Sequence, residues 1–356
     1  MNILEQIYEI SFEKVNFLER KEAIFEENTI LLGPPKCGKS YLIYDFLSKY
    51  DTSKYIYIDF DEYKNSDIDI IKNLDLFIEK NAIEVAVLEN YKFNFDLPKV
   101  TNTIITTNIN KTIENFTTLY LKPLDFEEFI LFDTKHQNIA NSFNSFLKYG
   151  NLPEIIDFVD TKKVKRNYEI CKLYCENKIE YEILFLLIKS SGEKKSIFQL
   201  FNQLKKTTKI SKDKFYEICD NFEFNNIVFF CKKYEQPKAV KKIFIFNHAL
   251  MDIVSYNKNF TNLFTNMVFL ELNKYQNEVF YLDNIDFYIP KENKIVLSIP
   301  FFNNIIIANI TKKLLPIIEK QNIQELFIIT VSSDQEIYIG DLEVQVMTFY
   351  NWVLSS

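Results

Sequence analysis

One short segment near the start of the chain constrains its fold more than any other feature. Gly33–Ser40 reads Gly-Pro-Pro-Lys-Cys-Gly-Lys-Ser, which matches the phosphate-loop pattern. It follows the apolar strand pattern Thr29–Leu32 and precedes Tyr41–Tyr50, whose apolar residues have helical spacing. Such a loop needs this context, because its backbone amides and the first helical turn together form an anion site. The sequence therefore predicts a phosphate-binding loop in an α/β fold.

Glycine is scarce, which makes a chance match to this pattern hard to obtain. The 356 residues include 5 Gly, whereas average usage would give about 25. Two of them, Gly33 and Gly38, lie in this one loop. We therefore predict that the loop binds a nucleotide. The predicted contact residues are Gly33, Pro34, Pro35, Lys36, Cys37, Gly38, Lys39, Ser40 and Tyr41.

The loop also predicts a metal and a catalytic group. Lys39 is expected to reach the β- and γ-phosphates, and the Ser40 hydroxyl to hold Mg²⁺. The strand pattern Ile83–Leu88 ends at Glu89, which either holds the same Mg²⁺ or is a strand-end surface charge. Asn90 follows, where a water-activating carboxylate often stands. Since an amide cannot take a proton from water, hydrolysis is expected to be slow or absent.

Other polar residues end neighbouring strand patterns. Asn108 closes the pattern Thr103–Thr107 and is placed to bond a γ-phosphate or a water, although Asn also favours turns. Asp59 and Asp61 end another strand pattern and are secondary candidates. The chain lacks the Asn-Lys-x-Asp guanine pattern, which favours ATP over GTP.

Arginine is almost absent. Only two of the 42 basic residues are Arg, namely Arg20 and Arg166. Neither has a sequence context that marks it as a clamp for transition-state charge.

The remaining patterns divide the chain into regions. Strands and helices alternate up to about residue 125, which predicts a parallel α/β sheet. The pattern then becomes mainly helical, and a helix, turn, helix and hairpin follow, the order expected of a winged helix. The last hundred residues predict a small α/β domain. The predicted strands are Tyr55–Asp59, Ile83–Leu88, Thr103–Thr107, Thr118–Leu121, Ile227–Phe230, Lys242–Phe246, Val279–Leu282, Ile285–Ile289, Ile295–Ile299 and Leu326–Thr330, and the predicted helices are Ile68–Lys80, Phe126–Phe132, Ile139–Tyr149, Pro153–Phe158, Lys165–Ser190, Ser196–Lys205, Ser211–Asn225, Leu263–Lys274 and Ile310–Gln321.

The net charge of -7 is unevenly distributed along the chain. Residues 1–160 carry a charge of -11, residues 161–260 carry +9, and residues 261–356 carry -5. The basic middle coincides with the predicted winged helix, so it indicates DNA binding or simply a solvated lysine face. Its lysines are Lys205, Lys206, Lys209, Lys212 and Lys214 around the second helix, and Lys232, Lys233, Lys238, Lys241 and Lys242 around the hairpin.

Cysteine and hydropathy patterns favour a cytoplasmic protein. The 5 Cys are scattered, no signal peptide opens the chain, and no apolar run is long enough to span a membrane. Cys171 and Cys175 share a helix face, yet two His in the chain supply no credible zinc site. Cys37, inside the loop, could block nucleotide binding if oxidised.

These residues resemble a group of prokaryotic proteins with an AAA-type ATPase domain, a winged helix and a C-terminal restriction-endonuclease-like domain of uncharacterised function. Besides the loop, four segments are similar to family patterns in the family's order. They are Leu121-Lys122-Pro123-Leu124-Asp125-Phe126-Glu127-Glu128-Phe129, Gly150-Asn151-Leu152-Pro153-Glu154, Lys242-Ile243-Phe244-Ile245-Phe246-Asn247-His248-Ala249-Leu250 and Asn266-Met267-Val268-Phe269-Leu270-Glu271-Leu272.

The chain departs from the family at positions that matter for catalysis. The family has Asp-Glu where this chain has Glu89-Asn90, and a family Arg falls near Asn115. The endonuclease-like pattern needs an Asp and then an acidic-x-Lys pair. Here Asp286 is followed by Ser298-Ile299-Pro300, and one carboxylate cannot hold a catalytic Mg²⁺ tightly. We therefore expect no nuclease activity.

The sequence thus predicts a P-loop domain over 1–135, a helical lid over 136–190, a winged helix over 191–260 and a degenerate endonuclease-like domain over 261–356. Catalytic candidates are Lys39, Asn90 and Asn108, and metal candidates are Ser40 and Glu89. Expected ligands are ATP and Mg²⁺. Three functions stay open: a slow ATPase switch, a nucleotide-stabilised scaffold without turnover, and a DNA-binding regulator. A homo-oligomer or a protein partner also stays open.

Overall fold

The computed structural model describes residues 3–8, 10–12, 15, 17–25, 27–65, 68–256, 259–274 and 278–355. The chain forms two compact units that divide between Lys122 and Pro123. Each unit has its own clusters of buried apolar side chains. None of the helices among these residues combines the length and the apolar composition that a membrane span requires.

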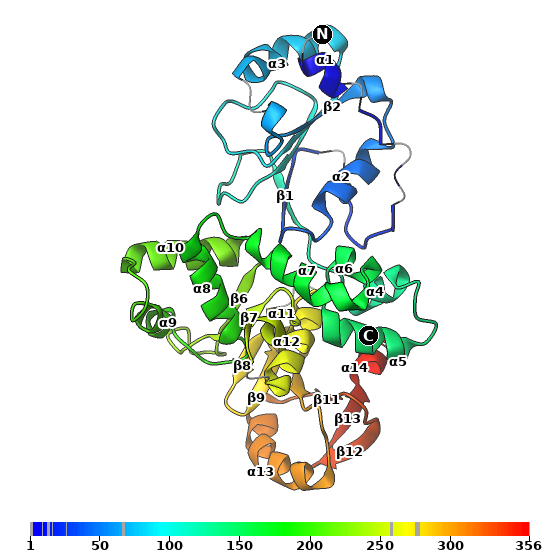
Figure 1. Ribbon diagram of the computed structural model, residues 1–356. Helices are drawn as coiled ribbons and strands as arrows, with labels where there is room; N and C mark the ends of the chain where they lie inside the picture. The colour runs from blue at the N-terminus through cyan, green and yellow to red at the C-terminus, as the bar shows by residue number, and fades with distance from the viewer. Residues whose placement is uncertain are drawn as a thin grey trace. The chain divides into compact units, whose positions relative to one another are not determined.

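The first unit, which carries the N-terminus in Figure 1, contains a five-stranded sheet in which every strand pair is parallel. The strand order is β2-β3-β4-β1-β5. Strands β1, β3 and β4 are buried along their whole length, as in a sheet covered on both faces, and their central residues are apolar. The prediction of a parallel α/β sheet is confirmed. The strands are β1 (Thr29–Leu32), β2 (Tyr55–Asp59), β3 (Val85–Glu89), β4 (Asn102–Thr106) and β5 (Thr117–Tyr120), and the helices are α1 (Ile3–Tyr8), α2 (Lys39–Leu47) and α3 (Ile68–Asn81), with 3₁₀ turns at Thr52–Lys54 and Tyr63–Asn65.

The second unit begins with a group of helices. The predicted helical stretch Lys165–Ser190 is two helices: the first ends at Lys172, and Asn177 caps the second by accepting from the Ile179 and Glu180 N–H groups. At the start of α4, Asp125 and Glu128 form a reciprocal capping box. The helices are α4 (Phe126–Phe132), α5 (Ile139–Tyr149), α6 (Pro153–Asp157), α7 (Asp160–Lys172) and α8 (Lys178–Lys189).

The elements expected at residues 196–246 are all present. Ser196 and Gln199 form a capping box at the start of the first helix, and Ser211 caps the second. The two strands pair antiparallel, and an isolated bridge joins Lys194 to Lys242. The winged-helix interpretation of this order stays a prediction. The elements are α9 (Ile197–Leu204), α10 (Lys212–Phe224), β6 (Val228–Cys231), β7 (Lys242–Ile245) and α11 (Leu250–Val254).

The C-terminal part of the second unit is a mixed six-stranded sheet in the order β12-β13-β11-β10-β9-β8, with helices beside it. The sequence analysis omits the hairpin of β12 and β13 and the helix that follows. A turn at Gly340 between two alternating segments was the available signal. The elements are α12 (Phe260–Asn273), β8 (Phe280–Leu282), β9 (Ile285–Ile289), a 3₁₀ turn (Pro290–Glu292), β10 (Lys294–Ser298), α13 (Asn304–Gln321), β11 (Glu325–Thr330), β12 (Gln335–Ile339), β13 (Leu342–Thr348) and α14 (Phe349–Ser355).

Candidate nucleotide site

The loop after β1 has a backbone that glycine alone accommodates at two points. Gly33 has φ 140°, and a Cβ built there would lie 2.1 Å from the Leu121 carbonyl oxygen. Gly38 has φ 105° and is the N-cap of α2, so it brings no side chain to the free N–H groups of the first turn. Lys36 also has a left-handed φ of 63°. The loop therefore leads directly into an uncapped helix N-terminus that favours an anion.

Lys39 folds back over the loop. Its ammonium group donates to the carbonyl oxygens of Gly33 at 2.8 Å and Pro34 at 2.9 Å. An ammonium has three N–H donors, so two bonds to the loop leave a third for a phosphate oxygen. The Lys39 side chain thus lies over the loop, and its expected contact with the β- and γ-phosphates stays a prediction.

The two predicted metal residues are in direct contact. The Ser40 hydroxyl donates to Glu89 Oε1 at 2.5 Å, although Ser40 lies in the first turn of α2 and Glu89 ends β3. Tyr57 donates to the other oxygen, Oε2, and its own hydroxyl lies 3.2 Å from that of Tyr44. The contact with Ser40 makes Glu89 part of the loop site rather than a surface charge, since its side chain is buried.

Burial sets the acidity of this carboxyl group. Desolvation raises the pKa of Glu89 above its ordinary value, and the bonds from Ser40 and Tyr57 act in the opposite direction. The negative charge of Asp59 raises the pKa further, while Lys39 lowers it. Desolvation and Glu89 raise the pKa of Tyr57 as well, so Tyr57 acts as a hydrogen-bond donor.

Asp59 belongs to the site more closely than the sequence analysis supposed. It lies opposite Glu89 in the β2–β3 register, and its Oδ1 accepts from the Asn90 side chain at 2.8 Å. Asn90 has φ 58°, and its own N–H donates to the Thr106 hydroxyl at 2.8 Å. The Asn90 amide, which was expected to orient water, thus donates an N–H to Asp59. Its amide oxygen can still accept a hydrogen bond.

The other predicted contact residues differ in exposure. Lys36 and Tyr41 are exposed, whereas Cys37 is fully buried and its Sγ donates to the Leu121 carbonyl at 3.4 Å. Burial shields this thiol from oxidants, which argues against the oxidation switch. Asn108 is exposed in the segment after β4, at the sheet edge where the parallel strands end. Pro34 is buried, and Pro35, Gly38, Lys39 and Ser40 are partly exposed.

The residues present fit Mg²⁺ by their chemistry. A hydroxyl and a carboxylate meet beside the helix N-terminus, and both are the hard oxygen ligands that Mg²⁺ prefers. No group of three or more His, Cys, Asp or Glu side chains placed to hold a metal is found within the described ranges. The ion would therefore depend on phosphate and water oxygens for its remaining ligands, as is usual for Mg²⁺ bound with a nucleotide.

The residues singled out in the second unit have structural partners. Asp286 accepts from Lys242 at 2.8 Å and from the Ser298 N–H at 3.1 Å, and the Ser298 hydroxyl bonds Thr265 at 3.1 Å. These polar groups are engaged with each other, and the expected lack of nuclease activity stays a prediction. Burial raises the pKa of both Cys171 and Cys175 to about 12, as expected of inert thiols.

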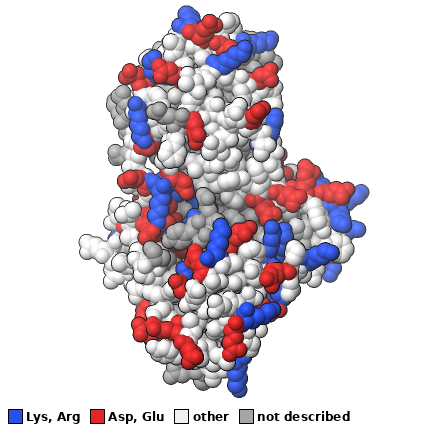
Figure 2. All heavy atoms as spheres, turned by 180° about the vertical axis from the view of Figure 1, so that it is seen from behind, with Lys and Arg blue, Asp and Glu red and all other residues white. Residues whose placement is uncertain are grey.

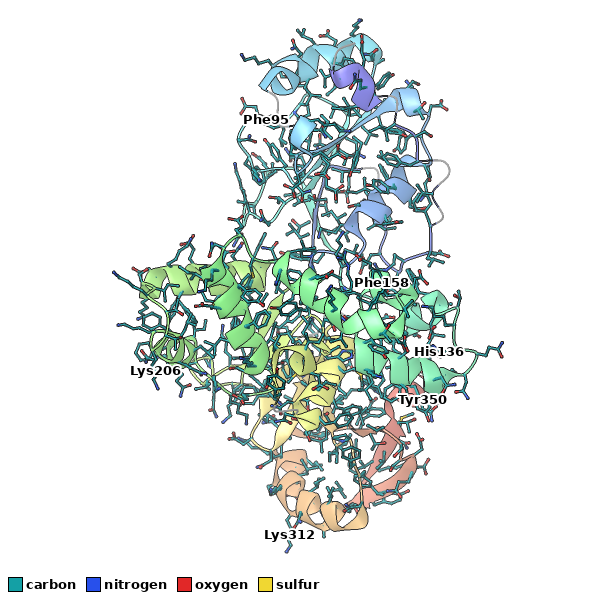
Figure 3. The ribbon with its side chains drawn as sticks, in the orientation of Figure 1. Phe95, His136, Phe158, Lys206, Lys312 and Tyr350 are labelled. Atoms are coloured by element: carbon teal, nitrogen blue, oxygen red, sulfur yellow. The ribbon has the colours of Figure 1, made fainter. Side chains whose placement is uncertain are left out.

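Several lysines of the basic middle are not free surface charges. Lys242 is buried against Asp286, and Lys233 pairs with Asp283 at 2.7 Å. By contrast, the lysines of the α9–α10 pair are exposed, and Figure 3 shows Lys206 at its outer edge. These exposed residues are Lys205, Lys206, Lys209, Lys212 and Lys214.

Known proteins give limited similarity. No family model matches the sequence. An uncharacterized protein of Methanocaldococcus jannaschii is 24% identical over 394 residues, covering 92% of this chain and 88% of its own. A Walker-type ATPase of Pyrococcus abyssi has a TM-score of 0.42 and 14% identity, covering 64% of this chain and 90% of its own. The ORC1 protein of Aeropyrum pernix, solved in complex with DNA, has a TM-score of 0.31 and 11% identity, covering 65% of this chain and 87% of its own.

Proposed function

We propose that this chain is an AAA-type P-loop protein that binds ATP with Mg²⁺ and hydrolyses it slowly. The observation that carries the proposal is the hydrogen bond between Ser40 and Glu89 beside a loop that glycine alone can form. It joins the two halves of a nucleotide site that lie 49 residues apart in the chain. Parallel sheets bind ligands at the carboxyl ends of their strands, where this site lies.

Each residue has a role in that proposal. Lys39 and the loop amides hold the phosphates, while Ser40 and Glu89 hold Mg²⁺, which when bound neutralises developing phosphate charge. Asn90 orients water through its amide oxygen, and Asn108 senses the γ-phosphate. With an amide in place of a base, and no arginine in the role of charge clamp, turnover is expected to be slow. The helices at 136–190 and the winged helix at 191–260 would change position with the bound nucleotide.

Thermal shift with ATP, ADP and GTP, each with and without Mg²⁺, tests the proposal. Phosphate release is then measured on the same samples. We expect ATP with Mg²⁺ to raise the melting temperature and Lys39→Ala to abolish both the shift and the release. A shift without release at any protein concentration would favour a nucleotide-stabilised scaffold. No shift with any nucleotide would contradict the proposal.

A second candidate function is DNA binding by the α9–α10 pair. Its five exposed lysines, named above, favour it, since lysines on a surface contact phosphates without regard to sequence. Acidic residues on α10, among them Asp213 and Glu217, oppose deep insertion into a groove. Figure 2 shows Lys and Arg interspersed with Asp and Glu on the face it presents.

A gel shift over a salt series tests DNA binding. Lys212→Ala with Lys214→Ala is expected to weaken the complex and to reduce its salt dependence. Lys233→Ala is the matched control, because the Lys233 side chain is 14% exposed and pairs with Asp283, whereas the Lys214 side chain, which pairs with Glu217, is 52% exposed. The absence of a shift at low salt would rule this function out.

A further inference from the structure

Arg20 makes two contacts with the backbone that its place in the sequence does not predict. Its guanidinium donates through Nη1 to the Cys37 carbonyl and through Nη2 to the Lys122 carbonyl, both at 2.8 Å. Cys37 belongs to the phosphate loop, and Lys122 follows the edge strand β5. One side chain thus joins two backbone segments that lie 85 residues apart.

The second arginine also serves two acceptors, although these are carboxylates and not backbone carbonyls. Arg166 uses Nε toward Glu154 at 2.5 Å and Nη1 toward Glu169 at 3.2 Å. In a chain that otherwise uses lysine, both arginines serve two acceptors at once through different nitrogens. The guanidinium N–H groups keep fixed directions relative to one another, whereas the N–H groups of an ammonium turn about a flexible stem. Lys39 also reaches two carbonyl oxygens, but these belong to consecutive residues of one loop. The acceptors of Arg20 lie on separate segments, so its contact depends on the guanidinium geometry and not only on a positive charge.

The bond to Cys37 fixes more than one carbonyl group. The described peptide bonds are all trans, so the Cys37 carbonyl and the Gly38 N–H point in opposite directions across one plane. Holding the carbonyl toward Arg20 turns the Gly38 N–H away from it. That N–H is one of the loop amides expected to meet phosphate, and the flexible φ of Gly38 would otherwise allow the peptide to rotate.

The other end of the contact is anchored. The neighbouring Leu121 donates its N–H to the Leu32 carbonyl at 2.9 Å, and its own carbonyl accepts from Cys37 Sγ. Segment 121–122 is therefore fixed to the end of β1 independently of Arg20. Cys37 Sγ already ties the loop to segment 121–122 through the Leu121 carbonyl. Arg20 adds a bond to the Cys37 main-chain carbonyl, which Sγ does not hold.

We propose that Arg20 is a positioning residue that pre-organises the phosphate loop for nucleotide binding. The proposal rests on the proposed function for the affinity it affects, but the loop order it predicts exists without nucleotide. Pre-organisation lowers the entropic cost of binding, so its loss weakens affinity without removing a ligand contact.

Two measurements on the full chain test this role. The first is hydrogen exchange of the amides in the segment 36–41 without nucleotide, and the second is ATP affinity with Mg²⁺ by calorimetry. We expect Arg20→Lys to speed exchange in this segment several-fold and to weaken ATP binding about tenfold, with a melting temperature close to that of the wild type. Arg20→Ala should show larger effects of the same kind. Arg166→Lys is the matched control and should leave both measurements unchanged.

The outcomes separate the two proposals. Unchanged exchange in both Arg20 variants, or faster exchange with wild-type affinity, would overturn the role of Arg20 while leaving ATP binding intact. If the wild-type chain does not bind ATP, the proposed function fails. In that case, faster hydrogen exchange in the Arg20→Lys variant would still support the role of Arg20 in holding the loop.

Discussion

At the scale of single residues, the contact between Asp59 and Asn90 shows what an amide does at position 90. A carboxylate at position 90 would face the Asp59 carboxylate at hydrogen-bond distance. Two carboxylates so close cannot both ionise without a penalty. The Asn90 amide therefore supplies Asp59 with a hydrogen-bond donor. Position 90 then carries no group that can take a proton from water.

A double-mutant cycle tests this pairing. Asn90→Asp is expected to lower the free energy of unfolding by about 1–2 kcal/mol through charge repulsion. The double variant with Asp59→Asn exchanges donor and acceptor, so it should recover most of the loss. Urea unfolding of the four proteins gives the coupling energy, expected to exceed about 0.5 kcal/mol. Additive effects would show that the two side chains act independently.

The hydrogen bond from Tyr57 to Glu89 leads to a prediction about the pH dependence of ATP binding. Its bond to Glu89 helps keep that carboxyl ionised, so Tyr57→Phe should raise the pKa of Glu89 still further. A protonated carboxyl cannot hold Mg²⁺, and the midpoint of Mg²⁺-dependent ATP binding should move to higher pH by about half a unit. Tyr44→Phe is the matched control, because Tyr44 bonds Tyr57 and not Glu89. Equal midpoints in both variants would contradict the role of Tyr57.

At the scale of secondary structure, the sequence predicted the first sheet almost residue by residue and the last one only in part. β1 and β2 match their predicted bounds because each is a short apolar run beside clear turn residues. The loop residues could be named because their chemistry is local. Tyr57 was not predicted, Arg20 was named without a role, and Asp59 was only a secondary candidate, since their contacts join segments that no periodicity brings together.

The contact between α4 and α12 carries a prediction about stability and pH. Glu271 of α12 accepts from the Phe126 N–H at 2.8 Å and pairs with Lys274 at 3.1 Å. Burial raises the pKa of Glu271 to about 7; Lys274 lowers it, and Asp125 raises it. Because its pKa is raised, Glu271 binds its proton more tightly in the folded state than in the unfolded state. This group therefore stabilises the folded state at low pH. That contribution is lost as pH rises from about 4.5 to 7.

Glu271→Gln should therefore flatten the pH dependence of stability. The slope of the free energy of unfolding between pH 5 and 7 is expected to become less negative by about 1 kcal/mol per pH unit. Glu127→Gln, which alters a more exposed partner of Lys274, is the control and should leave the slope nearly as in the wild type. Chemical unfolding at several pH values measures this slope in each variant. A slope unchanged by Glu271→Gln would show that this carboxyl does not titrate in the range.

At the scale of the whole molecule, the charge split of the sequence overstates the basic surface. Lys233 and Lys242 come from the basic middle, and their partners Asp283 and Asp286 come from the acidic end of the chain. Charges that look segregated in sequence thus neutralise each other within the second unit. Composition could not reveal these ion pairs, because the paired residues lie about 45 residues apart in the chain and meet through the sheet and hairpin contacts.

The division into two units predicts how a nucleotide acts on stability. The buried clusters around the phosphate loop lie within residues 4–121, and the others lie within 124–353. A ligand stabilises the structure that binds it, by about 2.7 kcal/mol at a hundred times its dissociation constant. ATP with Mg²⁺ should therefore slow hydrogen exchange throughout the first unit and leave the cores of the second unit unchanged.

Hydrogen exchange with and without ATP checks this, with Lys39→Ala as the control that should show no protection. A nucleotide switch would act by reorienting the units rather than by stabilising the second one, because orientation and core stability are separate properties. Small-angle scattering on the same samples should then change with ATP in the wild type alone. Equal protection of both units would mean that their stabilities are coupled, and the two cores would then unfold as one.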